Sequence, residues 1–301
     1  MTNNNFKNII KIKLLRGSYS ILRFVIIFGI GFIILKPILC KILLSFMSPS
    51  DLLDNTVRLF SKNPSIYYWK AGLKQIFLPN SFINTVILSL SIALIQTCFS
   101  TIVGYGLARF KFKGASIAFA FVIAMLLVPF QVISIAQYQT FVNLKIGTFQ
   151  IVDTFIPLYI LASTGLAIKE GLYVYLMREN FKSLSDTLEE AAYIDGAGVF
   201  RTFASVMVPN VRTMMITVFL FSFCWQWTDK TYSGLYLRDT KVLANLIGAV
   251  TIKNDLHLDT VGTEIARCAV SLFVAIPLIA LFVFCQKFFV KSISQTGLSS
   301  S

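Results

Sequence analysis

The stretch EEAAYIDGAG, residues Glu189–Gly198, is a polar interruption in a strongly apolar chain. It places three acidic residues, three alanines and two glycines side by side. Of the 301 residues, 56% are hydrophobic and 14% are charged, and the mean hydropathy is +0.73. Soluble domains carry about 25% charged residues. The composition therefore predicts an integral membrane protein in which this stretch lies outside the lipid.

Outward from this stretch, the chain contains six apolar segments long enough to cross a bilayer. They cover residues 21–46, 82–108, 115–137, 151–177, 210–228 and 264–289. A hydrocarbon core of about 30 Å needs about 20 apolar residues, and lipid offers no partner to an unpaired backbone group. We therefore expect an all-α, polytopic membrane protein with six transmembrane helices.

The first of these segments is interrupted by Lys36, Pro37 and Lys41. A cleaved signal peptide is the alternative for this segment, because basic residues precede it. However, the apolar part continues past Lys36 and no small-residue cleavage site follows. We therefore expect an uncleaved helix that is kinked at Pro37.

Basic residues outside the apolar segments are distributed unevenly between the two sides of the membrane. Fourteen lie in the amino-terminal tail, around the 109–113 loop, around the loop before residue 210 and in the carboxy-terminal tail, against nine on the other side. Cytoplasmic loops are enriched in lysine and arginine. Both termini and the EEAAYIDGAG stretch are thus predicted to be cytoplasmic.

The sequence disfavours several classes of function. The net charge of +13 flanks apolar segments and forms no basic stripe, so no nucleic-acid partner is expected. The five cysteines lack metal or redox spacing and His257 is the only histidine, so no metal site is expected. No G-x-x-x-x-G-K-[ST], H-E-x-x-H or G-x-S-x-G motif occurs. We expect no cofactor, no catalytic residue and no enzyme activity, which leaves transport, anchoring or signalling.

The region 182–209 is predicted to form a helix–turn–helix elbow on the cytoplasmic side. The sequence DTLE begins at Asp186 and fits a capping box, in which the Asp186 side chain caps a helix and Glu189 returns the bond. Gly196 and Gly198 are expected to end this helix and to allow a left-handed turn.

A second helical pattern follows the glycines and leads to Pro209. The alanines of the first helix flatten one face, which would suit contact with another protein. An interfacial helix lying on lipid headgroups is the alternative. Such helices usually carry lysine and arginine on their polar face, whereas this one is acidic.

Polar residues within the apolar segments are the candidates for a translocation path. The second segment contains Asn84 and Gln96 among seven polar residues, for which close helix packing is the alternative explanation. The fourth segment carries Lys169 and Glu170, which we expect two to three turns from the cytoplasmic edge and on different helix faces. These four residues are the possible pathway lining.

The spacing of the elbow residues matches a known pattern. Glu190-Ala191-Ala192, three residues, Gly196, nine residues and then VMVP ending at Pro209 resembles the EAA loop of bacterial ABC importer permeases. Valine stands at the isoleucine and leucine positions of that motif. Three further segments are similar to the maltose-transporter-type, sugar-class permeases: GLARFKFKG at 106–114, FSFCWQWTDKTY at 221–232 and QKFFVKSISQTG at 286–297.

This resemblance implies that the chain is a permease subunit of an ATP-driven, binding-protein-dependent importer for a sugar or oligosaccharide. Its location would be the bacterial plasma membrane, which it would cross several times. Its partners would be a second, different permease subunit, two cytoplasmic ABC ATPase subunits, an extracellular solute-binding protein and the lipid bilayer. ATP-driven closure of the ATPases would rock the spans between inward-open and outward-open states.

The resemblance also implies that the first helix of the elbow is a coupling helix that seats in a cleft on the ATPase. The expected ATPase-coupling interface consists of Leu188, Glu189, Glu190, Ala191, Ala192, Asp195, Gly196, Ala197 and Pro209. Two features depart from the family pattern. Ser185 stands where a proline is usual, and Lys169-Glu170 is not expected in the fourth segment, so no substrate residues are carried over.

The expected organisation runs from a cytoplasmic tail to a cytoplasmic tail. Its parts are the basic tail 1–20, the first transmembrane helix 21–46, an extracellular loop 47–81, a five-helix core 82–289 that includes the coupling loop 182–209, and the tail 290–301. A non-sugar solute such as a polyamine stays open. A secondary transporter and a membrane scaffold that moves no solute are alternatives from other classes.

Overall fold

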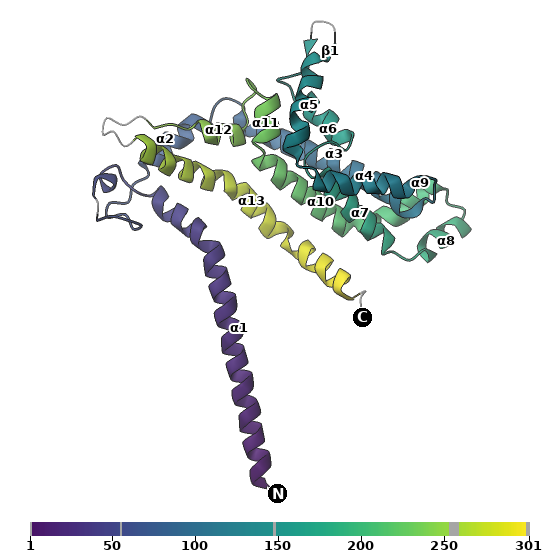
Figure 1. Cartoon of the computed structure of the whole chain (residues 1–301), viewed down its shortest axis with the longest axis horizontal. Helices are drawn as coiled ribbons and strands as arrows, with labels where there is room; N and C mark the ends of the chain where they lie inside the picture. Colours follow the sequence, from purple (N-terminus) through teal and green to yellow (C-terminus); the bar gives the residue numbers. More distant parts are fainter. Residues whose placement is uncertain (1, 55, 147–148, 253–258, 299–301) are drawn as a thin grey trace. The chain divides into compact units, whose positions relative to one another are not determined.

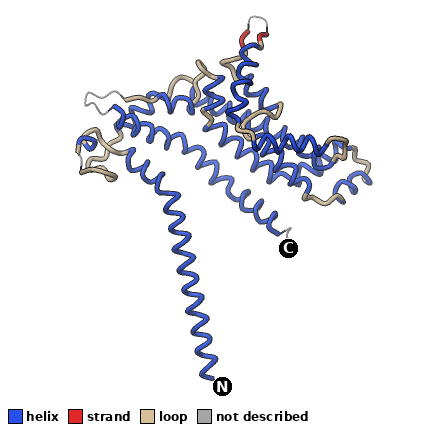
Figure 2. The backbone as a smooth tube through the Cα atoms, in the orientation of Figure 1, coloured by secondary structure: helices blue, strands red, loops and turns tan. Residues whose placement is uncertain are grey.

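The structure is almost entirely helical in the residues that it describes (Figures 1 and 2). This computed structural model describes residues 2–54, 56–146, 149–252 and 259–298. Within them, two-residue strands β1 (Lys145–Ile146) and β2 (Phe149–Gln150) pair antiparallel. The predicted all-α class is confirmed. The chain divides into two compact units, Met1–Leu73 with Thr251–Phe273 and Lys74–Val250 with Val274–Ser301.

The first unit contains α1 (Thr2–Ser45), the 3-10 helix η1 (Asp51–Leu53), most of α2 (Tyr67–Ile76) and the first turns of α13 (Asp259–Leu298). A glycine lets α2 and α13 approach closely. A Cβ atom on Gly72 would lie 2.7 Å from Cγ2 of Val270 and 3.2 Å from the backbone oxygen of Ala266. Small residues commonly allow such close packing of membrane helices.

The apolar part of α1, Tyr19–Ser45, leaves most of its side chains uncovered by the rest of the described chain. None of its most apolar 18-residue window is buried, and Ile33, for example, is 71% exposed. Pro37 lies inside this helix. An apolar helix thus covers the predicted segment, and its surface is of the kind that lipid covers.

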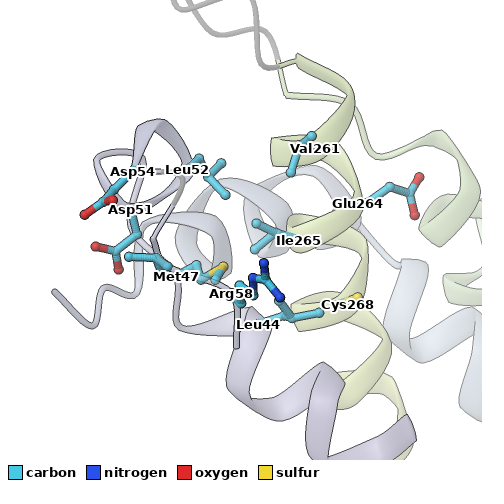
Figure 3. Close-up of a pocket in the computed structure, with 11 residues that line it drawn as sticks. Leu44, Met47, Asp51, Leu52, Asp54, Arg58, Val261, Glu264, Ile265 and Cys268 are labelled. Carbon is cyan, nitrogen blue, oxygen red and sulfur yellow. The ribbon is translucent and has the colours of Figure 1, made fainter. Parts of the chain in front are cut away.

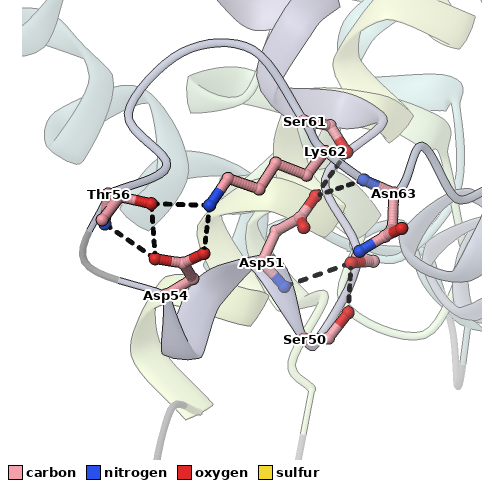
Figure 4. Close-up of polar contacts among 8 residues, drawn as sticks. Ser50, Asp51, Asp54, Thr56, Ser61, Lys62 and Asn63 are labelled. Atoms are coloured by element: carbon pink, nitrogen blue, oxygen red, sulfur yellow. Dashed lines mark hydrogen bonds and ion pairs between the residues drawn. The ribbon is translucent and has the colours of Figure 1, made fainter.

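A polar loop follows α1 in the same unit (Figure 4). The carboxylate of Asp51 accepts hydrogen bonds from the Ser61 hydroxyl group and from the backbone N–H of Asn63, the latter at 3.3 Å. Nearby, the ammonium group of Lys62 lies 2.5 Å from the carboxylate of Asp54. These contacts join the two ends of the loop to each other.

The second unit is built around α3 (Ser81–Arg109), which packs mainly against α7 and α10 (Figure 1). Its other elements are α4 (Ala115–Leu127), α5 (Phe130–Asn143), α6 (Ile156–Ser163), α7 (Glu170–Lys182), α8 (Thr187–Ile194), α9 (Val199–Thr202), the π-helix η2 (Phe203–Met207), α10 (Val208–Thr228), α11 (Thr231–Tyr236), α12 (Leu243–Ala249) and the later turns of α13.

The polar residues of α3 lie mostly in the packed core of this unit. The hydroxyl groups of Thr97 and Thr101 donate to carbonyl groups one turn earlier in their own helix, at 2.7 and 2.6 Å. At Gly104, a Cβ atom would lie 2.7 Å from Cβ of Met177 and 2.9 Å from the backbone nitrogen of Arg178. Close packing therefore accounts for much of the polarity of this segment.

The third predicted span, 115–137, is not one helix. It consists of α4 and α5, which meet at a bend of 103°. Pro129 causes this bend, because proline cannot donate a backbone hydrogen bond and forces the residue before it out of the helical region. Val128 accordingly has an extended backbone, with φ −73° and ψ 120°.

The fourth predicted span, 151–177, is also broken. It contains α6 and most of α7, which are separated by residues 164–169. Two residues in this break have left-handed backbone conformations, Gly165 with φ 81° and Lys169 with φ 63°. Such residues cannot continue a right-handed helix. The helical part of this segment continues to Lys182, beyond the predicted end at Met177.

Four helices of the described chain are long and apolar enough to cross a membrane, and a fifth crossing arises if α4 and α5 form one broken span. The four are Tyr19–Ser45, Ser81–Arg109, Val199–Thr228 and Thr260–Gln286. The prediction of continuous helices for the third and fourth segments is therefore wrong, and the number of six spans is not confirmed.

Candidate functional site

The first helix of the predicted elbow is α8, and it ends in a left-handed turn at Gly196. Gly196 has φ 80°, and its N–H donates to the carbonyl of Tyr193 at 3.0 Å. The N–H of Ala197 donates to the carbonyl of Ala192 at 2.9 Å. This pair of bonds is the Schellman motif, in which glycine avoids the strain that a Cβ atom would introduce.

The second glycine has a different role from the one predicted. Gly198 precedes α9 with φ −75° and ψ 168°, which is an extended conformation open to any residue. Gly196 alone therefore requires glycine in this turn. The two glycines provide a matched pair, since neither position has an atom within 4 Å of an added Cβ.

The predicted capping box at the start of α8 is wrong. Asp186 makes no side-chain hydrogen bond to the helix, and its carbonyl oxygen instead accepts the N–H groups of Glu189 and Glu190 at 3.0 and 3.1 Å. The reason is conformational: a capping residue normally has an extended backbone, whereas Asp186 has φ −64° and ψ −26°. Its carboxylate pairs with Arg109 instead.

Arg109, the last residue of α3, lies inside the corner between α7 and α8. Its Nη1 atom contacts the carboxylate of Asp186. Its Nη2 atom donates to the carbonyls of Phe181 at 2.9 Å and Leu184 at 2.7 Å. Its Nε atom lies 3.6 Å from Oε2 of Glu189, and the Arg109 side chain is only 7% exposed. One guanidinium group thus contacts both sides of the corner.

Tyr105, one turn earlier on α3, adds a second contact to the same helix. Its hydroxyl group donates to Oε1 of Glu189 at 2.8 Å. Its ring packs against Phe181 and Phe203, with centroids 5.3 and 4.8 Å away. Edge and tilted aromatic contacts of this kind contribute about 0.5–1.5 kcal/mol each beyond the buried area. The elbow is therefore anchored to α3 by charge, by hydrogen bonds and by ring packing.

The elbow also presents apolar side chains to the surroundings. Ile194 is 85% exposed and Phe200 is 88% exposed, and Tyr193 and Val199 are each 45% exposed. Exposed apolar groups that adjoin one another mark a contact surface for another molecule. We call these four residues the elbow patch.

The residues predicted for the interface fall into groups by exposure. Glu190, Ala191, Asp195, Gly196 and Pro209 are exposed; Leu188, Glu189 and Ala197 are intermediate; Ala192 is buried. Two exposed acids, Glu190 and Asp195, therefore accompany the elbow patch, whereas Glu189 is turned toward Arg109 and Tyr105.

Sequence reasoning missed Arg109, Tyr105 and the elbow patch. Arg109 and Tyr105 lie about 80 residues before α8, and nothing in the spacing joins the two regions. Phe200 belongs to the helical pattern that follows the glycines, in which apolar residues are expected to pack inward. The available signal was the group of basic residues at 109–113. This group served only to predict the orientation in the membrane.

The elbow continues into the membrane segment without a break. α9, η2 and α10 form one helical run, Val199–Thr228, with a π-helical stretch near its start. Pro209 explains this stretch, because it cannot donate to the carbonyl of Ser205 and its ring crowds that group. The side-chain amide of Asn210 donates to the carbonyl of Val206 at 2.7 Å. A displacement of the elbow would therefore act directly on α10.

Two of the predicted pathway residues hold chain segments together. Gln96 donates from Nε2 to the carbonyl of Ile168 at 3.1 Å and accepts a hydrogen bond from Ser222. Asn84 donates from its amide to the carbonyl of Lys241 at 3.2 Å. Gln96 thereby links α3, the break before α7 and α10.

The other two, Lys169 and Glu170, point in different directions, as predicted. Lys169 is exposed, and its ammonium group lies 4.9 Å from the centroid of the Trp225 ring. Glu170 is 1% exposed, and neither carboxyl oxygen has a hydrogen-bond partner in the described part of the chain. Since α7 has 13 residues, this pair lies about 20 Å from the Lys182 end of the helix, farther than the two to three turns predicted.

A pocket of about 380 Å³ lies in the first unit, between the end of α1, the polar loop and α13 (Figure 3). In Figure 3 the guanidinium group of Arg58 reaches toward α13. The carboxylate of Glu264, a residue of α13, points away from Arg58. Asp51 also lines this pocket, and its hydrogen bond from Ser61 is the main cause of a pKa below the ordinary 3.8.

The described residues contain no group of three or more His, Cys, Asp or Glu side chains arranged to hold a metal ion. His257, which sequence analysis singled out, lies outside the described residues. The second unit consists of packed helices and an elbow that Arg109 and Tyr105 anchor to α3.

Comparison with known protein families gives one match that covers most of the chain. Residues 96–295 match the family described as the binding-protein-dependent transport system inner membrane component. This region includes α8, Arg109 and the Val199–Thr228 run.

Curated relatives are similar along nearly their whole length. The arabinooligosaccharides transport system permease protein AraQ of Halalkalibacterium halodurans is 27% identical over 278 residues, covering 89% of this chain and 92% of the relative. The maltodextrin transport system permease protein MalD of Streptococcus pneumoniae is 24% identical over 290 residues, covering 95% and 98%.

A solved structure shares the fold. A chain of a bacterial ABC transporter involved in the import of the acidic polysaccharide alginate superposes with a TM-score of 0.70 at 18% identity, covering 90% of this chain and 96% of that chain. A second structure of an alginate ABC transporter, in complex with a pentasaccharide-bound periplasmic protein, gives a TM-score of 0.64 at 14% identity.

Proposed function

We infer the role of this chain from its family, because it belongs to the binding-protein-dependent transport system inner membrane components. It is a multi-pass membrane subunit of a transport system, and it moves solute rather than catalysing a reaction. We propose that it is a permease subunit of an ATP-driven ABC importer in the bacterial plasma membrane. The solute is a sugar or an oligosaccharide, a class supported by the relatives for arabinooligosaccharides and maltodextrin.

The proposed partners follow from this role. A second, different permease subunit completes the pore, two cytoplasmic ABC ATPase subunits hydrolyse ATP, and an extracellular solute-binding protein delivers the solute. The uncovered apolar surface of α1 supports contact with lipid or with the second permease. The alginate transporter bound to a periplasmic protein supports the delivery step by analogy of fold.

The observation that carries the coupling mechanism is the elbow. α8 and the elbow patch present exposed apolar side chains beside Glu190 and Asp195, while the other side of α8 is tied to α3. We propose that this outer surface seats in the ATPase cleft. Of the predicted residues, the proposed interface keeps the exposed Glu190, Ala191, Asp195, Gly196 and Pro209, and it adds Ile194 and Phe200.

The proposed topology has both termini and the coupling loop 182–209 in the cytoplasm. Six crossings require that α4–α5 and α6–α7 each act as one broken span. The parts are then the tail 1–20, the helix 21–46, the outer loop 47–81, the core 82–289 and the tail 290–301. Asn84, Gln96, Lys169 and Glu170 are the proposed polar positions near the pathway.

Replacement of Gly196 tests the coupling role. In the complex purified from its host and reconstituted in vesicles, Gly196→Val should abolish sugar uptake while ATP hydrolysis persists. The physical reason is that a β-branched residue at φ 80° costs about 1–2 kcal/mol and would shift the angle of the elbow. Uptake of labelled oligosaccharide and phosphate release are measured on the same vesicles.

The matched control is Gly198→Val, because Gly198 is extended and equally open to a Cβ atom. It should retain most of the uptake. Equal losses in the two variants would contradict the role of the left-handed turn. Uptake driven by an ion gradient, with this chain alone and no ATP, would overturn the proposed function and indicate a secondary transporter.

A further inference from the structure

Arg109, at the end of α3, contacts both sides of the corner between α7 and α8. The corner between α7 and α8 consists of residues 183–186, which have no regular structure of their own. Ser185, at the position where the resembling family usually has proline, leaves this link freer to rotate than a proline ring would. Something other than the backbone must therefore fix the direction of α8 relative to α7.

The contacts of Arg109 supply this fixation on the α7 side. The carbonyl groups at the end of a helix lack partners within that helix and carry partial negative charge. Nη2 of Arg109 donates to the carbonyls of Phe181 and Leu184, at 2.9 and 2.7 Å. A planar guanidinium group suits this task, because its donors lie in a rigid fork.

The same side chain also binds the start of α8. Asp186 contacts Nη1, and Glu189 lies 3.6 Å from Nε. Arg109 is 7% exposed and Glu189 is 13% exposed, so water screens this pair less than it screens a surface ion pair. Tyr105, four residues before Arg109 on the same face of α3, donates to the other oxygen of Glu189.

We propose that Arg109 is the positioning residue that makes α8 move as one body with α3 and α7. This inference rests on the proposed coupling role of α8. When the ATPase displaces α8, the displacement reaches α3 through Arg109 and Tyr105, in addition to reaching α10 along the chain. Asp186 and Glu189 serve this internal contact, which leaves Glu190 and Asp195 for the ATPase.

The test compares Arg109→Gln with Lys111→Gln in the complete reconstituted complex. Both remove one positive charge at or just beyond the end of α3, but Lys111 is exposed and outside the corner. Two quantities are measured: oligosaccharide imported per ATP hydrolysed, and amide hydrogen exchange of residues 183–196. Exchange reports the anchoring itself and does not depend on transport.

Arg109→Gln should raise the exchange of this segment about tenfold or more, because it removes several charge-assisted hydrogen bonds. Uptake per ATP should fall by a similar factor, and Lys111→Gln should match the wild type. Arg109→Lys, which keeps the charge and loses the fork, should recover only part of both quantities.

Unchanged exchange in Arg109→Gln would overturn the proposal. If this variant does not assemble, Tyr105→Phe decides the question, because it removes one hydroxyl group and should raise exchange at Glu189 by a smaller factor; unchanged exchange there would likewise overturn it. A wild-type complex without ATP-driven uptake would instead refute the proposed function. Faster exchange in Arg109→Gln with unchanged uptake per ATP would show that the contact is structural, and would overturn its role in coupling.

Discussion

At the scale of single residues, Lys169 and Glu170 show how one left-handed backbone conformation separates two opposite charges. The left-handed backbone at Lys169 sends the ammonium group outward, over Trp225, while Glu170 enters the core beside Gln96. An ionised carboxyl group without a partner is costly in such surroundings. The pair therefore behaves as two independent residues rather than as an ion pair.

Neutralisation of Glu170 should therefore stabilise the protein. Glu170→Gln keeps the size of the side chain and removes the charge, so the midpoint of thermal unfolding in detergent should rise by about 2–4 °C, which corresponds to about 1 kcal/mol. The control Lys169→Gln changes the exposed neighbour and should shift the midpoint less. A lower midpoint for Glu170→Gln would show that the carboxylate is stabilised by a contact in the folded protein.

The residue scale also shows a limit of sequence reasoning. Gly196 could be predicted as a helix end because its signal is local. The capping box at Asp186 could not be tested from sequence, because Arg109 competes for the same carboxylate from a distant part of the chain. Local motifs are reliable where no remote charge reaches them.

At the scale of elements, the polar loop after α1 depends on the carboxylates of Asp51 and Asp54, which differ in their surroundings. Asp51 is buried against the pocket and its pKa lies below 3.8, chiefly because Ser61 donates to it. A carboxyl group with a lowered folded-state pKa adds stability that is complete above its unfolded pKa and is lost as the pH falls through its folded value.

The loop should consequently loosen in acid. Amide exchange of residues 48–63, corrected for the intrinsic rate, should stay constant from neutral pH to about pH 4 and should increase below it. Asp51→Asn should show fast exchange already at neutral pH. Asp54→Asn removes a more exposed contact with Lys62 and should have a weaker effect. Loosening at equal pH in wild type and Asp51→Asn would contradict this role of Asp51.

The broken third and fourth spans show which element properties sequence can predict. Pro129 signals the bend between α4 and α5 in the sequence itself, but the prediction rested on length and hydropathy and did not use it. The break before α7 is less visible, because Lys169 adopts a left-handed backbone that lysine rarely prefers. Packing against Gln96 and Trp225 accompanies that conformation, and such contacts are not encoded locally.

At the scale of the whole molecule, the orientation in the membrane follows from the distribution of basic residues and is open to a direct test. In a cysteine-free background, Lys113→Cys and Lys230→Cys place one thiol on each predicted side, and both native lysines are exposed. A membrane-impermeant thiol reagent added to intact cells should label the variant at 230 and spare the one at 113.

Permeabilised cells provide the control, because both variants should then react. Labelling of position 113 in intact cells would reverse the orientation and would remove the elbow from the cytoplasm. It would thereby contradict the proposed contact with the ATPase as well. The family membership would stand, because it rests on residues 96–295 as a whole.

The exposure of Phe200 and Ile194 has a consequence for biosynthesis. With the proposed seat of the elbow on the ATPase, a subunit made in excess would leave this apolar patch unshielded, and the patch would bind chaperones or recruit proteases. The steady level of the chain should therefore follow the supply of its ATPase. Balanced gene dosage, rather than strong expression of this subunit alone, is the condition for obtaining it in quantity.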